Sequence, residues 1–163
     1  MNAIAADLKH IIENATERLQ AIPESLTEAS HIDGQWSAKQ ILGHLIDSAA
    51  NNHQRFVRAQ FTDDLVFQGY NQEQWIRVQH YDEELWTDLI DLWRGYNLHL
   101  AHVISQIPED KLTQLRTAHT LDKIAWQTVS ATEPTTLDYL IRDYLGHLQA
   151  HLEQLFAVAQ AEQ

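Results

Sequence analysis

Three histidines in this chain have the spacing and neighbours that suit metal binding. The residues Leu-Gly-His-Leu occur twice, once around His44 and again around His147, roughly a hundred residues later. The second copy is followed by His151, four residues further on. Two histidines four residues apart share one face of a helix and can bind a single ion together. Neutral imidazole suits zinc, nickel, copper and iron.

Helical periodicity places these histidines at the edge of a hydrophobic arc and not on the solvent face. His147 and His151 flank the apolar arc of the last helical pattern, next to Tyr144. With His44 they predict a three-histidine site for one divalent transition metal, zinc or nickel being favoured. A site with three protein ligands and open positions is the catalytic type. Water bound to such a metal has a pKa near neutrality and can act as a nucleophile or base.

A structural explanation of the same pattern stays open at this point. In a chain with ten histidines, a pair four residues apart can be incidental, and the repeated motif can reflect packing. Gly43 and Gly146 remove a side chain beside each key histidine, which predicts a close approach of helices at a cost in helix propensity of about 1 kcal/mol each. His99 and His102 are weaker ligand candidates. The other histidines are expected at the surface or in loops: His10, His31, His53, His80 and His119.

A polar stripe runs along the second helical pattern from His44. It consists of Ser48, Asn51 and Arg55, and we expect these residues, together with Tyr144, to form a substrate-binding wall beside the metal. An ordinary solvated helix flank is the alternative. No side chain is assigned a catalytic role, and the sequence offers no obvious general base beyond metal-bound water.

Four long helical patterns must position these residues. Ser37 precedes the second pattern with Gln40 three residues on, which predicts a capping box at its start. Thr135 or Thr136 is expected to cap the last pattern, and the acids at 82–84 suit the positive end of the third. The predicted helices run from about Ala3 to Ala21, from Ser37 to about Gln60, from about Asp82 to Pro108, and from after Pro134 to about Ala159.

Two long inserts separate the last three helices. Residues 61–81 are rich in aromatics, which suits either a lid or a satellite core. Residues 109–134 contain the alternating stretch KIAWQTVS, which predicts a short strand or hairpin. Such connections predict an all-α four-helix bundle with crossovers, formed by the single domain 1–163. A faint repeat of helix, Ile-Pro-Glu, insert and LGHL helix predicts that His44 and His147 face each other.

Composition excludes several functional classes. The formal net charge of −12 disfavours nucleic acid and anionic membranes as partners. Without cysteine, the chain has no disulfide and no thiolate of its own. No apolar run approaches the roughly 18 residues of a membrane span. The amphipathic N-terminus lacks the pattern of a signal peptide, so a cytoplasmic location is expected.

Three segments resemble the DinB/YfiT-like superfamily. WSAKQILGHLIDSAANNHQRFVRA at 36–59 is similar to its second-helix signature. GYNQEQWI at 69–76 resembles the Tyr-x-x-x-x-Trp segment that follows there, and YLGHLQAHLEQL at 144–155 resembles the terminal His-x-x-x-His helix. The resemblance implies a four-helix bundle with crossovers and one divalent metal held by His44, His147 and His151. Asp47 matches the acid that commonly follows the first histidine, although the helical wheel turns it away from the core arc.

The resemblance also carries expectations about function. Members are similar to S-transferases that use bacillithiol or mycothiol, or have been described as metal-dependent hydrolases, and are often dimers. We therefore expect a metal-dependent thiol S-transferase that acts on a small molecule, takes a low-molecular-weight thiol as co-substrate and forms a homodimer. The alternatives are a hydrolase that uses metal-bound water, or a non-catalytic dimeric bundle that binds a metal or a small ligand.

Overall fold

The structure is a computed structural model, and it describes residues 3–28 and 34–161. It confirms the all-α class and the four long helices. Within the described residues, no helix is long and apolar enough to cross a membrane. The four long helices are α1 (Ala3–Gln20), α2 (Ala38–Arg58), α4 (Trp86–Gln106) and α7 (Leu137–Ala161).

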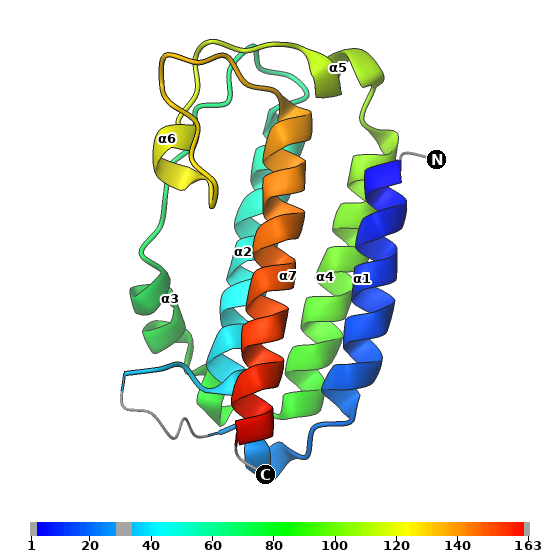
Figure 1. The fold of residues 1–163 in the computed structure, drawn as a ribbon, viewed down its shortest axis with the longest axis vertical. Coiled ribbons are helices and arrows are strands. Elements are labelled where there is room, and N and C mark those ends of the chain that lie inside the picture. Colours follow the sequence, from blue (N-terminus) through cyan, green and yellow to red (C-terminus); the bar gives the residue numbers. More distant parts are fainter. Residues whose placement is uncertain (1–2, 29–33, 162–163) are drawn as a thin grey trace.

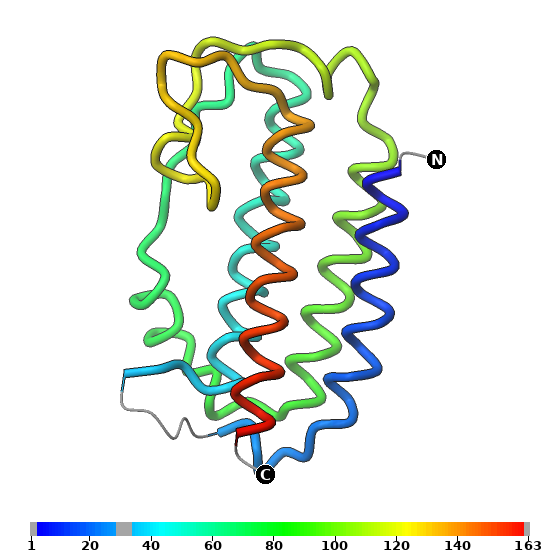
Figure 2. The backbone as a smooth tube through the Cα atoms, viewed as in Figure 1, coloured from blue at the N-terminus to red at the C-terminus, as the bar shows by residue number. Residues whose placement is uncertain are grey.

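The four helices form a bundle in which two neighbours run parallel. In Figure 1, α1 and α7 run downward while α2 and α4 run upward. Helix α4 packs against α1 and α2, and α2 also packs against α7. Because α2 and α4 are parallel, the chain must return along the length of the bundle between them, as the tube in Figure 2 shows. This is the crossover arrangement that the two long inserts predicted.

The connections contain short helices that the sequence pattern did not reveal. Helix α3 lies on the outside of the bundle beside α2, and Asn71 caps it by accepting from the Gln74 N–H. The final connection passes over the end of the bundle before α7 begins. The short elements are η1 (Glu24–Leu26), α3 (Gln72–Gln79), η2 (Tyr81–Glu83), α5 (Glu109–Thr113) and α6 (Leu121–Ile124).

The strand predicted over KIAWQTVS is wrong. Within the described residues, pairing of the strand type is limited to two isolated bridges, Leu65 with His119 and Arg116 with Thr135. The alternating segment cannot join a ladder because two of its N–H groups, those of Trp126 and Gln127, donate to a side chain of α7. The alternation of apolar and polar residues in this segment comes from a loop that packs one side against α7.

Polar side chains cap the starts of α2 and α4, which lie at the same end of the bundle. The predicted capping box of α2 is present, since Ser37 and Gln40 exchange side-chain and backbone hydrogen bonds. Helix α4 begins later than predicted, and the acids at 82 and 83 lie in η2. Glu24 supplies the carboxylate at the start of α4, where it accepts from the Trp86 N–H and pairs with buried Lys39 at 2.7 Å.

Candidate metal centre

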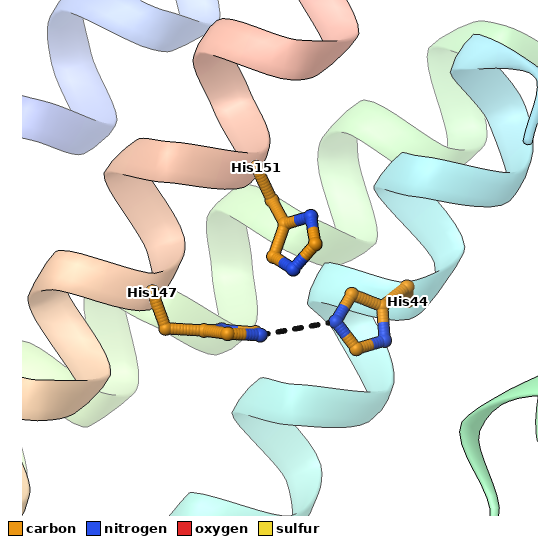
Figure 3. Close-up of side chains that lie close together, drawn as sticks. All are labelled: His44, His147 and His151. Atoms are coloured by element: carbon orange, nitrogen blue, oxygen red, sulfur yellow. Dashed lines mark hydrogen bonds between the residues drawn. The ribbon is translucent and has the colours of Figure 1, made fainter. Parts of the chain in front are cut away.

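His44, His147 and His151 meet between α2 and α7. The Nε2 atoms of His44 and His147 are 3.1 Å apart, and one ligand atom from each of the three residues lies within 4.8 Å of the others. Figure 3 shows the three rings converging from the two helices. The expectation that His44 and His147 face each other is confirmed. We call these three residues the histidine centre.

The separation of the His44 and His147 Nε2 atoms suits a tetrahedral metal. With Zn–N bonds of about 2.0–2.1 Å, neighbouring nitrogen ligands lie roughly 3.3 Å apart, close to the separation of His44 and His147. The Nδ1 atom of His151 donates to the Gln154 Oε1 atom at 2.8 Å, because an amide oxygen can only accept. This bond leaves the lone pair of His151 Nε2 free for an ion, so the centre fits a divalent transition metal.

Burial keeps two imidazoles of the centre, those of His44 and His147, uncharged near neutral pH. His44 is fully buried, and this desolvation, with His147 and His151 close by, lowers its pKa from 6.5 to about 3. Burial, with a smaller effect of His151, lowers the pKa of His147 to about 4. Both imidazoles are therefore neutral at pH 7, the form that binds a metal.

A cavity of about 340 Å³ opens beside the histidine centre. His147 and His151 line one end, so a group in the cavity can reach the open side of the centre. Among the expected substrate-binding residues, Ser48, Arg55 and Tyr144 line this cavity. We call it the histidine cavity.

Asn51 lies outside the lining of the histidine cavity. Its amide donates along its own helix to the Asp47 carbonyl, and its side chain borders a neighbouring cavity that Arg55 also lines. Asn52, one residue later, lines the histidine cavity in its place. A helical wheel alone cannot choose between them, because the position of the crossover decides which face of α2 is enclosed.

Tyr144 lines the cavity, but its hydroxyl is not available to a ligand. It is buried, and its O–H donates to the Asn97 Oδ1 atom on α4. Burial raises the pKa of this hydroxyl above its usual range. Tyr144 therefore provides an apolar wall and does not offer a proton to a ligand.

The two glycines beside the key histidines accommodate aromatic rings from the connections. A Cβ atom on Gly43 would collide with the ring of Tyr81, and one on Gly146 would lie 3.0 Å from the Trp126 ring. The sequence predicted that two helices approach closely at these glycines, and this prediction is wrong. The group that packs on each glycine is an aromatic ring from a connection. Each glycine lets a connection lie directly on the helix that carries the histidine.

Asp47 is buried although the helical wheel turns it away from the core arc. The crossover covers this face of α2, and the carboxylate accepts hydrogen bonds from the Tyr81 hydroxyl at 2.7 Å and the Gln79 amide at 2.8 Å. Burial raises its pKa despite these two bonds. Asp47 thus fastens the segment around η2 to α2.

Asp143 is a site residue that the sequence pattern did not single out. Its carboxylate accepts from the Trp126 and Gln127 N–H groups at 2.9 and 2.7 Å, and it lines the histidine cavity. The Trp126 ring lies 6.5 Å from that of His147. Its spacing in the sequence could have indicated this role. Asp143 lies one helical turn before His147 and so shares a face of α7 with it.

The other histidines that the structure describes lie apart from the centre. His53 and His99 form a ring contact at 5.0 Å on the α2–α4 side, and His102 is exposed. His119 is in a loop as expected but is buried, with its Nε2 atom 2.8 Å from the Glu133 carbonyl oxygen. His31 lies outside the described residues.

Comparison with known proteins identifies the family and the fold of the chain. A match to the DinB superfamily covers residues 7–155. No curated protein sequence matches the chain. Among solved structures, YfiT from Bacillus subtilis matches with a TM-score of 0.75 and 14% sequence identity, over 99% of this chain and 89% of that one. YfiT is described as a probable metal-dependent hydrolase with an unusual four-helix bundle topology. At this identity the likeness establishes the fold.

Proposed function

The chain belongs to the DinB superfamily, and from this membership and the histidine centre we propose that the protein is a metal-dependent enzyme that transfers a small thiol to an electrophile. The observation that carries the proposal is the convergence of three imidazoles, two of them kept neutral by burial, at one end of a cavity. A divalent metal in such a site lowers the pKa of a bound thiol or water, so that the nucleophilic anion forms near neutral pH.

The chain's own residues bind and position the reactants in this proposal. His44, His147 and His151 hold the metal, zinc or nickel. Ser48 and Arg55 offer polar contacts along α2, and Tyr144 provides the apolar wall. Among the described residues, Asp143 supplies the one carboxylate that lines the histidine cavity, and two backbone N–H groups engage it. A pre-formed thiolate needs no additional base, which favours thiol transfer over chemistry that depends on a protein base.

Hydrolysis by metal-bound water is the second candidate. The likeness to YfiT, described as a probable metal-dependent hydrolase, supports it. The two candidates share the histidine centre and differ in the nucleophile. A non-catalytic bundle that binds a metal or small ligand would show neither activity. The expected homodimer stays a prediction, which sedimentation of the purified protein tests.

The test compares nucleophiles on protein loaded with zinc or nickel. Turnover of 1-chloro-2,4-dinitrobenzene is measured with bacillithiol, mycothiol or cysteine, and hydrolysis of 4-nitrophenyl acetate without thiol. We expect thiol-dependent turnover that disappears in a His147→Ala/His151→Ala variant. Ester hydrolysis that needs the histidines but no thiol would select the hydrolase. If both rates equal those of the variant, the enzyme proposal fails.

A further inference from the structure

Arg55 is a buried cation that forms no ion pair with the part of the chain that the structure describes. Its side chain is 7% exposed, and it donates to the Asn52 amide oxygen and the Gln68 carbonyl, both at 3.3 Å. No carboxylate of the described residues lies within ion-pair distance of it. Lys39, by contrast, is also buried but pairs with a glutamate at 2.7 Å. Buried charges in proteins are normally paired, so an unpaired buried guanidinium needs an explanation.

The end of α2 explains only part of this arrangement. Arg55 lies in the last turn of the helix, where the helix dipole favours a cation. Arg58 lies in the same turn, however, and is exposed. A solvated side chain such as that of Arg58 interacts with the helix dipole as well, so the dipole does not explain why Arg55 is buried. Arg55 is instead buried between the histidine cavity and the neighbouring cavity, and it lines both.

The histidine cavity is cationic in a strongly acidic protein. Arg55 lines it and Lys123 is an exposed residue of its lining. The carboxylate that the described residues contribute to the lining, that of Asp143, is held by two N–H groups. The formal net charge of the chain is −12, so this local excess of positive charge runs against the whole molecule. A pocket of this kind concentrates small anions. Its apolar lining includes Leu140 and Trp126, which suits a ligand with a hydrocarbon part.

The positive charge and the histidine centre lie at different heights along the cavity. His44 and Arg55 are eleven residues apart on α2, which is about 16 Å along the helix axis. Ser48 and Asn52 lie between them and line the same wall. A single elongated ligand can therefore reach Arg55 with one end and the centre with the other.

We propose that the small molecule used at the histidine centre carries a carboxylate, which Arg55 binds, joined by an apolar segment to the reacting atom. This inference rests on the proposed function for the role of the centre, and it adds the substrate class. The planar guanidinium offers two parallel N–H donors that match a carboxylate. The amide and hydroxyl groups between the two ends supply further polar contacts.

The test uses metal-free protein, so that the probe cannot bind a metal instead. Hexanoate and hexan-1-ol, which differ in the acid group, are titrated into nitrogen-15-labelled protein near neutral pH. The Arg55 Nε–H resonance is identified by its absence in Arg55→Lys. We expect hexanoate to shift this resonance saturably and hexan-1-ol to leave it unchanged. The Arg58 resonance is the internal control and should not move.

Affinity measured on a second variant tests the same inference. Arg55→Gln should lose about tenfold or more in hexanoate affinity, as for a charge-assisted hydrogen bond, while Arg58→Gln retains it. The inference is overturned if hexanoate does not bind, if it leaves the Arg55 resonance unmoved, or if it binds no better than hexan-1-ol. Metal uptake is measured separately, so failure of the proposed function and failure of the carboxylate site give different results.

Discussion

At the scale of single residues, the histidine centre depends on glycines as much as on its ligands. The LGHL motif keeps its glycine because a ring from a connection lies on each histidine-bearing helix, Tyr81 on Gly43 and Trp126 on Gly146. The repeated motif and its histidines can be read from the sequence. The sequence could not reveal the rings, because they come from irregular segments whose path depends on tertiary packing.

Alanine substitution of two glycines should have opposite effects on stability. In Gly43→Ala the added methyl group would collide with the Tyr81 ring, so the variant should be less stable by about 1–3 kcal/mol. Gly95, in α4, has open space at the same atom, so Gly95→Ala should stabilise by about 0.5–1 kcal/mol. Chemical denaturation measures both. A Gly43→Ala protein as stable as the wild type would show that Tyr81 does not pack there.

Stability of the metal-free protein should depend on pH through the buried histidines. The pKa values of His44 and His147 are lowered to about 3 and about 4, so the unfolded state binds more protons below about pH 6.5. Stability is therefore full above that pH and falls as the pH drops. We expect a loss of about 2 kcal/mol between about pH 7 and about pH 5, after discounting for the partial exposure of His147.

Denaturant unfolding at a series of pH values measures this loss. His147→Gln should flatten the dependence, because the variant has no buried imidazole to protonate at that position. His102→Gln, which changes an exposed residue of α4, should follow the wild type. A wild-type curve that stays level from neutral to mildly acid pH would contradict the burial of the centre.

At the scale of elements, the last connection is fastened to α7 by one carboxylate. Asp143 binds two successive N–H groups and holds Trp126 beside His147. Asp143→Ala should remove both bonds and lower the local opening free energy by about 1–3 kcal/mol. Hydrogen exchange of the Trp126 and Gln127 amides should become faster by roughly 10- to 100-fold.

Asp138 provides the matched control on the same helix. It pairs with Arg142 one turn away at the surface, a contact worth only a few tenths of a kcal/mol. Asp138→Ala should therefore leave exchange at 126–127 unchanged. Unchanged exchange in Asp143→Ala as well would show that the connection is held by other contacts.

Long helices were predictable and connections were not, for physical reasons. Periodic apolar residues and the Ser37 capping box define α2 almost to the residue. The Thr136 hydroxyl accepts from the Tyr139 N–H, as expected for a cap at the start of α7. The alternating segment before it misled because alternation is equally compatible with a loop that packs one side on a helix. Its backbone partners, supplied by Asp143, lie on a different element.

At the scale of the whole molecule, the parallel pairing of α2 and α4 makes the site possible. Helix α2 contacts both α4 and α7, so it carries the core on one side and the histidine centre on another. The crossover and the final connection then enclose the cavity from outside the bundle, with Tyr70 from one and Trp126 from the other in its lining. Four helices alone would leave the histidines in an open groove.

The charge of the molecule is distributed so that the cavity differs from the surface. A net charge of −12 surrounds a cavity lined by Arg55 and Lys123. The sequence predicted Arg55 as a polar residue near the centre, but its burial without a carboxylate depends on the fold. A single domain and a cytoplasmic location stay predictions.

Elemental analysis shows directly whether the histidine centre binds a metal. Protein purified without an affinity tag or chelator is compared by elemental analysis with His147→Ala/His151→Ala and, as a control for other histidines, His99→Ala/His102→Ala. We predict close to one equivalent of zinc or nickel in the wild type and the control, and none in the first variant. No bound metal in any of the three, even after loading with zinc or nickel, would contradict the account and leave the histidine centre as a packing feature.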